Sequence, residues 1–299
     1  TNIIAPILSP KEFTEFMIKY KPNHTITVPT YVEHFVHDRK ADSMNWKCLK
    51  NIGIGGDYFS EQSEIYVNEF LKNHGSSSIA EKGYGMTENS STAGVCLVGV
   101  NKTNSLGIPL PLNTYGIFER GTDKELKYGE EGEICITGPT EMLGYLDNEE
   151  EESKVIKIHS DGKKWIHSED VGIIDEDGFL FFKGRYKRLI PHGGFKLYPS
   201  YIEGVIMKHP DIDNCCVISI PDKVYGASPE AHVVIKKNRV SELKKLKEEL
   251  IKLCQDKLPS YSQPEDFIFE EDLPLTSVGK VDYKKVEKMR IKKLEESTK

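Results

Sequence analysis

The sequence contains neither a long hydrophobic run nor an excess of basic residues. In its 299 residues, no apolar stretch approaches the roughly 18 residues that a membrane-spanning helix requires, so we expect no membrane span. Acidic residues outnumber basic ones by 47 to 40, which gives a formal net charge of −7. Because a general nucleic-acid-binding surface has to neutralise phosphates, this balance argues against nucleic acid as a partner.

Cysteine is scarce and is not arranged for metal binding. The six cysteines stand at positions 48, 96, 135, 215, 216 and 254, and none of them forms a C-x-x-C pair. A structural zinc site needs paired ligands at short spacing, so the pattern favours reduced, buried thiols. The start of the sequence also lacks a basic segment followed by an apolar one, so we expect no secretion signal and a cytoplasmic location.

Length and patterning predict an α/β and α+β multidomain protein. At roughly 150 residues per domain, the chain is long enough for about two domains. Residues 1–105 alternate strands with amphipathic helices, which is typical of a partial α/β layer with a parallel sheet. Residues 106–185 hold short β-like segments separated by glycine and are expected to form a β-rich, barrel-like subdomain. Residues 186–299 mix strands and helices, as a small α+β domain does.

Two glycine-rich stretches resemble nucleotide-binding motifs but do not match them. In Gly53-Ile54-Gly55-Gly56-Asp57-Tyr58, tyrosine stands where the dinucleotide-binding fingerprint needs its last glycine. Gly279-Lys280 is not part of a Walker phosphate loop, because Pro274 and Val281 replace the first glycine and the Ser or Thr. Neither stretch predicts a function by itself.

Four further segments are informative as an ordered set. They are GYGMTE at 83–88, GEICITG to GYL at 132–146, WIHSEDVG to YPSYIE at 165–203, and LPLTSVGKVD at 273–282. In this order and spacing they resemble the adenylate-forming superfamily, which includes acyl-CoA synthetases, peptide-synthetase adenylation domains and firefly luciferase. The resemblance covers nearly the whole chain, but only the later part of the family's sequence.

Members of this superfamily are much longer than this chain. Upstream they have a Ser/Thr/Gly-rich loop, ending in lysine, that holds the β- and γ-phosphates of ATP. We do not find that loop here, and we therefore expect the chain to be an N-terminally truncated portion of a longer enzyme.

The resemblance implies a nucleotide site at the GYGMTE segment. Tyr84, followed by Gly85 and Met86, would present an aromatic face to adenine, and Thr87 would offer its hydroxyl to the α-phosphate. Glu88 would be a hard oxygen ligand for Mg²⁺ beside the phosphates. Taken alone, the same residues favour a tyrosine in a turn and an exposed Thr-Glu pair, and the ordered set of motifs favours the site instead.

Two more segments would complete the nucleotide site. Gly55, Gly56, Asp57 and Tyr58 resemble the family's adenine-edge segment, in which glycine lets the backbone approach the base closely. A strand-to-helix turn explains the same four residues.

Asp170 resembles the family carboxylate that accepts both ribose hydroxyls, since a carboxylate can accept from two donors. Arg185 resembles the arginine that faces ribose or phosphate, and its alternative is a surface turn. The family usually has Thr-Gly-Asp where this chain has Ser168-Glu169-Asp170, and a glutamate at the glycine position is expected to alter the turn.

The resemblance also implies that the C-terminal domain swings between two poses. Lys187 stands where the family has its hinge. Lys280 resembles the lysine that bridges carboxylate and α-phosphate during adenylation. Gly193 and Gly194 resemble the glycine loop beside the pantetheine path, although two glycines are also typical of a hairpin turn.

The expected function is ATP-dependent activation of a carboxylic acid to acyl-AMP, followed by transfer to coenzyme A. ATP or AMP, Mg²⁺ and coenzyme A are the cofactors that this implies. One alternative is adenylation of an amino or aryl acid for loading onto a carrier protein, and another is a catalytically silent nucleotide-binding fragment. An incomplete large domain would expose apolar surface, so self-association is also expected.

Overall fold

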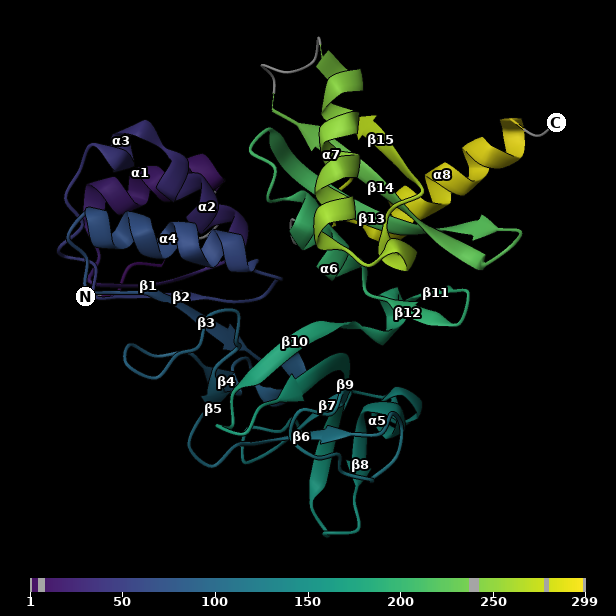
Figure 1. Ribbon diagram of the computed structural model, residues 1–299. Helices are drawn as coiled ribbons and strands as arrows, with labels where there is room; N and C mark the ends of the chain where they lie inside the picture. Colours follow the sequence, from purple (N-terminus) through teal and green to yellow (C-terminus); the bar gives the residue numbers. More distant parts are fainter. Residues whose placement is uncertain (1, 5–8, 237–241, 277–279, 298–299) are drawn as a thin grey trace. The chain divides into compact units, whose positions relative to one another are not determined.

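The computed structural model describes residues 2–4, 9–236, 242–276 and 280–297, and the chain divides into two compact units (Figure 1). The first unit is Thr1–Phe182 and the second is Lys183–Lys299. This boundary lies close to the predicted one after residue 185. The finer division of the first unit after residue 105 stays a prediction.

The first sheet has the strand order β1-β2-β3-β4-β5 and begins with three parallel strands. Its members are β1 (His24–Thr27), β2 (Asn51–Ile54), β3 (Ala80–Tyr84), β4 (Gly94–Val95) and β5 (Ile108–Pro109). The helices of this region are α1 (Pro10–Tyr20), α2 (Pro29–His37), α3 (Arg39–Asp42) and α4 (Glu61–Asn73). The predicted α/β alternation with a parallel sheet is therefore confirmed.

Local sequence explains where these helices begin and which face of the sheet they cover. Ser9 caps α1 by accepting the Glu12 N–H, and Ser60 caps α4 in the same way. The helices lie on one face of β1 and β2 (Figure 1), where Ile52 and Ile54 are buried with the helical core. Ile26 points to the opposite face and is 89% exposed, as expected from the period of two in a strand.

The second sheet is antiparallel and belongs to the predicted β-rich part. Its order is β10-β9-β7-β6, with β8 paired to β9. The strands are β6 (Thr114–Phe118), β7 (Gly132–Thr137), β8 (Ile156–Ile158), β9 (Lys164–Ile174) and β10 (Leu180–Arg185), and α5 (Glu149–Val155) precedes β8. Glu133 pairs with Val171 but Cys135 pairs with His167, so residues 168–170 form a bulge in β9.

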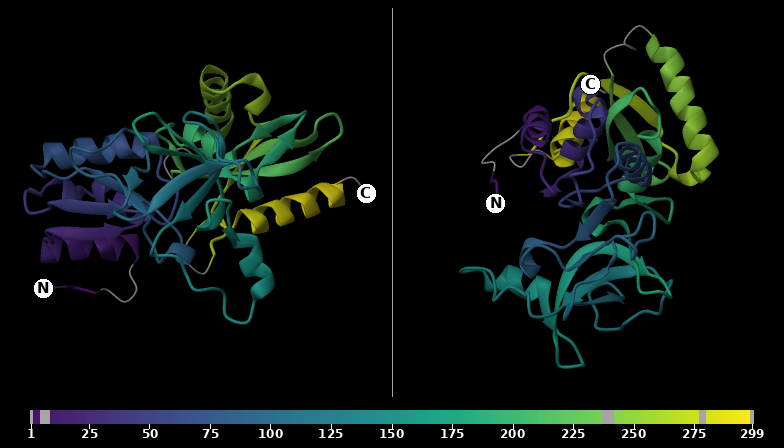
Figure 2. Two further views of the ribbon diagram at one scale, coloured as in Figure 1. Left: turned by 90° about the horizontal axis from the view of Figure 1, so that it is seen from below. Right: turned by 90° about the vertical axis from the view of Figure 1, so that its left-hand side faces the viewer.

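The second unit is an α+β domain with helices on both faces of one sheet. The strand order is β12-β11-β14-β13, with β15 beside β14. The strands are β11 (Ile190–His192), β12 (Phe195–Leu197), β13 (Ile212–Asp222), β14 (Gly226–Ile235) and β15 (Asp266–Glu270), and the helices are α6 (Pro199–Ile206), α7 (Leu243–Lys257) and α8 (Tyr283–Ser297). Figure 2 shows α7 and α8 on opposite sides of this sheet.

Successive side chains of β13 point to opposite faces of the sheet, so each face has its own hydrophobic cluster. Cys215 and Val217 lie in the core shared with α6 and α7, whereas Cys216 and Ile218 lie in a second cluster with Val286 of α8. All six cysteines of the chain are free thiols, and all but Cys48 are buried, as the sequence predicts. Within the described residues, no helix combines the length and the apolar character that crossing a bilayer requires.

Candidate nucleotide site

The carboxyl ends of the parallel strands β2 and β3 lie next to each other and bear two of the predicted segments. Gly55 follows β2 directly, and a Cβ atom on it would lie 3.5 Å from the carbonyl oxygen of Gly83 on β3. Gly56 has a φ of +85°, so the chain turns there in a conformation that favours glycine. Ligands of α/β proteins bind outside this end of a parallel sheet.

Tyr84 and Asp170 are joined by a hydrogen bond, although they are far apart in the sequence. Tyr84 ends β3, Asp170 stands in the β9 bulge, and the tyrosine hydroxyl donates to Asp170 Oδ2 at 2.9 Å. Burial and the neighbouring Asp170 charge raise the pKa of Tyr84 well above its usual value, so the phenol remains a donor. The structure thus brings two predicted nucleotide contacts together.

The ring of Tyr84 is covered by protein. Only 9% of Tyr84 is exposed, and Tyr115 packs edge-on against it with the ring centroids 6.0 Å apart. The predicted stacking of this ring on adenine therefore stays a prediction. Its hydroxyl bond to Asp170 is the contact that the structure describes.

The turn after Tyr84 has no space for another side chain and fixes the next residues. A Cβ on Gly85 would lie 1.8 Å from the carbonyl oxygen of Ser91, so only glycine fits. The Met86 N–H donates to Asn89 Oδ1 at 2.6 Å, at the start of the short helix η1 (Thr87–Asn89). Thr87 is exposed. Its hydroxyl is accessible to a ligand at this edge.

Glu88 is held by the GYL segment of the second motif. The Tyr145 hydroxyl donates to Glu88 Oε1 at 2.5 Å, and the Met142 N–H donates to the Glu88 carbonyl oxygen at 2.7 Å. Burial, then the hydrogen bond and charge of Glu88, raise the pKa of Tyr145 to about 12. Tyr145 lies in the GYL segment, whose sequence indicates no role for it, and only the fold shows that Glu88 is its partner.

The oxygen donors at this turn fit the predicted metal. Glu88 supplies a half-exposed carboxylate, and Thr87 supplies an exposed hydroxyl one residue away. Mg²⁺ prefers such hard oxygen ligands and usually keeps part of its water shell. The donor set is therefore compatible with Mg²⁺ at Glu88.

Asp57 and Tyr58 lie beyond β2 on the same edge of the first unit. Asp57 Oδ1 accepts the Tyr58 N–H at 2.8 Å, which stabilises the turn. The Tyr58 ring is partly exposed and lies 6.3 Å, centroid to centroid, from the ring of Phe182. The two rings are tilted by 43° to each other and lie next to the Gly55–Gly56 turn.

The β9 bulge accommodates the departure from the family pattern. Glu169 has a φ of +57°, in the left-handed region that glycine adopts without strain. Ser168 Oγ donates to the Ile134 carbonyl oxygen at 2.6 Å and accepts the Asp170 N–H at 3.0 Å. Glu169 thus adopts a left-handed conformation, which accounts for the glycine that the family usually has at this position.

The remaining predicted residues belong to the second unit. Arg185 ends β10 and Lys187 lies in the short helix η2 (Tyr186–Arg188), both exposed. Gly193 and Gly194, with φ values of +54° and +90°, form the two-residue turn between β11 and β12, so the hairpin reading is confirmed. A role in thioester formation stays a prediction, as do the roles of Arg185 and Lys187.

Lys280 lies on an exposed loop of the second unit. The Thr276 N–H donates to the Lys280 carbonyl oxygen at 2.7 Å, and Leu275 bridges to Val281. These contacts pair the chain on the two sides of residues 277–279, which include Gly279 and lie outside the described residues. The contact of Lys280 with a nucleotide stays a prediction.

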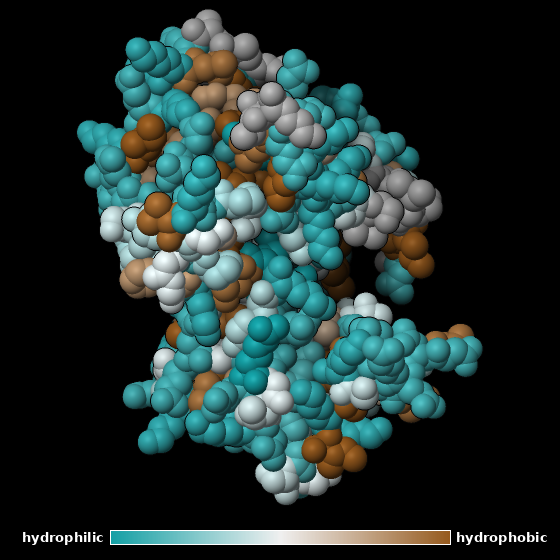
Figure 3. Space-filling view, turned by 90° about the vertical axis from the view of Figure 1, so that its right-hand side faces the viewer, coloured by the Kyte–Doolittle hydropathy of each residue, from teal (hydrophilic) through white to brown (hydrophobic). Residues whose placement is uncertain are grey.

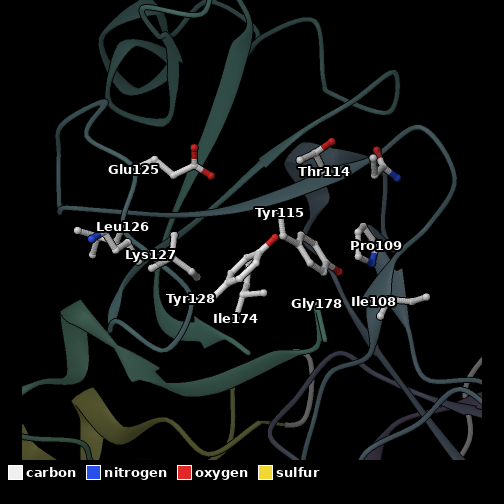
Figure 4. Close-up of a pocket in the computed structure, with 12 residues that line it drawn as sticks. Ile108, Pro109, Thr114, Tyr115, Glu125, Leu126, Lys127, Tyr128, Ile174 and Gly178 are labelled. Carbon is white, nitrogen blue, oxygen red and sulfur yellow. The ribbon is translucent and has the colours of Figure 1, made fainter. Parts of the chain in front are cut away.

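A separate cavity of about 370 Å³ lies in the β-rich part of the first unit (Figure 4). Figure 4 shows the rings of Tyr115 and Tyr128 next to Ile174 along its wall. Tyr115 also packs against Tyr84, but the cavity lining includes none of residues 55–58 or 83–88. The cavity is therefore distinct from the edge formed by residues 55–58 and 83–88.

Comparison with known proteins matches both units. A family model described as "AMP-binding enzyme" matches residues 1–146, and one described as "AMP-binding enzyme C-terminal domain" matches residues 201–280. The chain belongs to the family of AMP-binding enzymes. The predicted resemblance to the adenylate-forming superfamily is thereby confirmed.

Curated relatives of this AMP-binding chain are CoA ligases. It is 32% identical over 280 residues to a probable 4-coumarate–CoA ligase of Dictyostelium discoideum, covering 93% of this chain and 49% of that protein. It is 29% identical over 297 residues to a long-chain-fatty-acid–CoA ligase of Bacillus subtilis, covering 99% and 49%. The chain spans about half the length of these relatives.

Solved structures show the same fold. MatB from Rhodopseudomonas palustris with ATP bound has a TM-score of 0.81 at 23% identity, covering 96% of this chain and 54% of that one. The anthranilate CoA ligase AuaEII in complex with anthranoyl-AMP has a TM-score of 0.82 at 20% identity, covering 94% and 52%. The adenylate-forming fold of both units is therefore established.

Proposed function

We propose that this chain supplies the adenosine-binding edge and the mobile C-terminal domain of an ATP-dependent acyl-CoA synthetase. The observation that supports this most directly is the Tyr84–Asp170 hydrogen bond at the carboxyl ends of the strands, next to the accessible Thr87 and Glu88. The CoA-ligase names of the relatives favour CoA over a carrier protein as the acyl acceptor.

In the first half-reaction a carboxylate oxygen attacks the α-phosphorus of ATP, and pyrophosphate leaves, giving acyl-AMP. Asp170 accepts the ribose hydroxyls, and Tyr84 holds the carboxylate in the required direction through its own hydroxyl. Thr87 donates to an α-phosphate oxygen, on which charge develops during the attack. Glu88 would hold Mg²⁺, which would supply positive charge to offset that of the phosphates.

Lys280 acts in the same half-reaction. Its ammonium bridges the attacking carboxylate and the α-phosphate, so it stabilises charge that is redistributed between them. Rotation about Lys187 then exchanges this pose for one in which the Gly193–Gly194 turn borders the thiol path. In the second half-reaction the CoA thiolate attacks the acyl carbon and AMP leaves.

Half-reaction analysis of the protein that carries this chain tests the proposal. With ATP, Mg²⁺ and a panel of acids that includes 4-coumarate and a long-chain fatty acid, we expect acyl-AMP by mass spectrometry and acyl-CoA once CoA is added. Lys280→Ala should lower acyl-AMP formation at least about a hundredfold. The same variant should still convert supplied acyl-AMP to acyl-CoA.

The neighbouring Lys284→Ala is the matched control and should change neither step. Failure to form acyl-AMP from any acid, or loss of both half-reactions in Lys280→Ala, contradicts the proposal.

Two further expectations accompany this function. Free thiols throughout the chain are consistent with a cytoplasmic location. On the face drawn in Figure 3, hydrophobic side chains form small separate groups among hydrophilic ones. Leu143 and Leu146 are almost fully exposed, and self-association through such groups is part of the proposal.

A further inference from the structure

Glu133 is a buried carboxylate on β7 that reaches the backbone of the bulge bearing Asp170. Its Oε1 accepts the Glu169 N–H at 3.0 Å, and its Oε2 accepts the Gly121 N–H at 3.2 Å. Only 2% of Glu133 is exposed. The Glu169 N–H belongs to the Ser168–Glu169 peptide, so this carboxylate fixes the backbone one peptide before Asp170.

Two histidines continue the network behind Glu133. His167 Nδ1 lies 3.0 Å from Glu133 Oε2, and His167 Nε2 lies 2.9 Å from His159 Nε2. If Nδ1 of His167 donates to the carboxylate, its Nε2 accepts, and the proton between the rings belongs to His159. His159 Nδ1 is then unprotonated, in keeping with its burial without a hydrogen-bond partner among the described residues.

Charge and burial favour this arrangement. Burial alone would raise the pKa of Glu133, but the hydrogen bonds from His167 and the two backbone N–H groups outweigh it and leave the pKa lowered. Burial, followed by the neighbouring His167, lowers the pKa of His159. The carboxylate is therefore ionised at neutral pH, and His159 is neutral.

The bulge needs such support. Its middle residue, Glu169, lies in the left-handed region, which costs an ordinary L-residue energy. The Ser168 hydroxyl donates to the Ile134 carbonyl oxygen and accepts the Asp170 N–H, and both bonds stabilise the bulge. Glu133 accepts a hydrogen bond from the Glu169 N–H at the centre of the bulge. Without Glu133, this N–H would lose its acceptor.

The same cluster has the composition of a metal site but is better explained by hydrogen bonding. One ligating atom each from Glu133, Cys135 and His167 lie within 4.8 Å of one another. However, the Glu133 oxygens already accept from Glu169, Gly121 and His167. Burial also raises the pKa of the Cys135 thiol, which disfavours the thiolate that a metal would bind.

We propose that Glu133 is a positioning residue for the nucleotide site. Through the Glu169 N–H it sets the direction of the Asp170 carboxylate toward the ribose hydroxyls, and His167 with His159 holds Glu133 in place. This inference rests on the proposed function, in which Asp170 binds ribose. In this proposal Glu133 and His159 act through the backbone of the bulge and do not contact the nucleotide.

Calorimetry with AMP and with 2′,3′-dideoxy-AMP tests this role. In Glu133→Gln an amide NH₂ faces N–H donors, so at least one of the three hydrogen bonds is lost. The wild-type chain should bind AMP more tightly than the dideoxy analogue. In Glu133→Gln we expect that preference to fall about tenfold, with the affinity for the dideoxy analogue unchanged.

Glu119→Gln is the matched control, because Glu119 is an exposed carboxylate of the same unit that pairs with Lys124. It should leave the preference unchanged. His159→Phe, which removes the donor to His167 but keeps Glu133, should reduce the preference in the same direction by a smaller factor. It also provides the test if Glu133→Gln does not fold.

A preference that survives in both variants overturns the inference, and so does an equal loss of affinity for both nucleotides, which indicates a merely structural role. A wild-type chain that binds AMP without preferring the ribose hydroxyls overturns it as well. If the wild type binds no AMP, the proposed function itself fails, and the two failures are thereby distinguished.

Discussion

At the scale of single residues, the Tyr84 hydroxyl and the Asp170 carboxylate define the candidate site. The sequence placed both in a nucleotide site through motif resemblance, and the fold brings them within 2.9 Å. Their direct bond was not predictable, because the 84–88 and 165–172 motifs meet only through sheet packing. The same holds for the Glu88–Tyr145 pair.

Glycine requirements were more accessible from the sequence than polar contacts. Gly85 and Gly56 occur in short motifs where a tight turn or a close backbone approach is expected, and the structure confirms both geometries. The Glu133–His167–His159 network was missed, although Glu133 and His167 stood in quoted motifs. No local sequence pattern indicates that His159, eight residues before His167, is the hydrogen-bond partner of His167.

Replacing Glu169 by glycine should stabilise the first unit. Glutamate at a φ of +57° is strained, whereas glycine adopts this conformation freely. After the entropy cost of glycine in the unfolded chain, we expect Glu169→Gly to raise the free energy of unfolding by about 0.5–1 kcal/mol. Urea unfolding followed by tryptophan fluorescence measures it, because both tryptophans lie in the first unit.

Glu169→Ala is the control for this change. It removes the exposed Arg120 ion pair, whose atoms are 3.8 Å apart, but keeps a Cβ at positive φ. It should therefore bring no gain in stability. A lower urea midpoint for Glu169→Gly than for the wild type would show that the left-handed conformation is not strained here.

At the scale of elements, α8 is tied to the sheet of the second unit through a buried ion pair. Arg290 of α8 donates to both oxygens of Glu230 on β14, at 2.7 and 2.8 Å. His232 on the same strand lies 3.1 Å from Glu230 and 2.9 Å from Glu270 on β15. Through Arg290, Glu230, His232 and Glu270, the network links three elements, α8, β14 and β15.

This network predicts acid sensitivity of the second unit. Burial alone would raise the pKa of Glu230, but the bonds from His232 and Arg290 lower it from 4.5 to about 2. Because the folded-state pKa lies below the unfolded one, the contribution is full above pH 4.5 and is lost as the pH falls toward 2. Far-UV circular dichroism during urea unfolding, at steps from about pH 5 to about pH 3, should show this loss.

Arg290→Met should destabilise the second unit at neutral pH by about 3 kcal/mol, because it leaves a buried carboxylate without its cation. The slope of stability against pH should also become smaller. Lys292→Met, on the same helix but exposed, serves as the control. Equal pH slopes for the wild type and Arg290→Met would argue that Glu230 titrates normally.

Regular elements followed from the sequence better than irregular ones. The alternation of strands and amphipathic helices predicted for residues 1–105 is realised in α1 and α4, which Ser9 and Ser60 cap. The predicted buried thiols include Cys215 and Cys216, which lie on opposite faces of β13. The β9 bulge was not foreseen as such, because register shifts depend on the partner strand.

At the scale of the whole molecule, the ordered motifs predicted the family and the fold. The chain spans about half the length of its curated relatives and divides into two units. Asp170 and Tyr84 belong to the first unit, and Lys280 to the second. The first unit therefore allows nucleotide binding to be tested separately from adenylation.

Calorimetric titration of this chain with AMP in the presence of magnesium tests the central claim most directly. We expect AMP to bind, and Asp170→Asn to weaken binding about tenfold or more, because the carboxylate loses its charge and one acceptor. Circular dichroism should show that the variant keeps its fold. Absence of AMP binding by the wild-type chain, or equal affinity in folded Asp170→Asn, would contradict the assignment of this edge as the adenosine site.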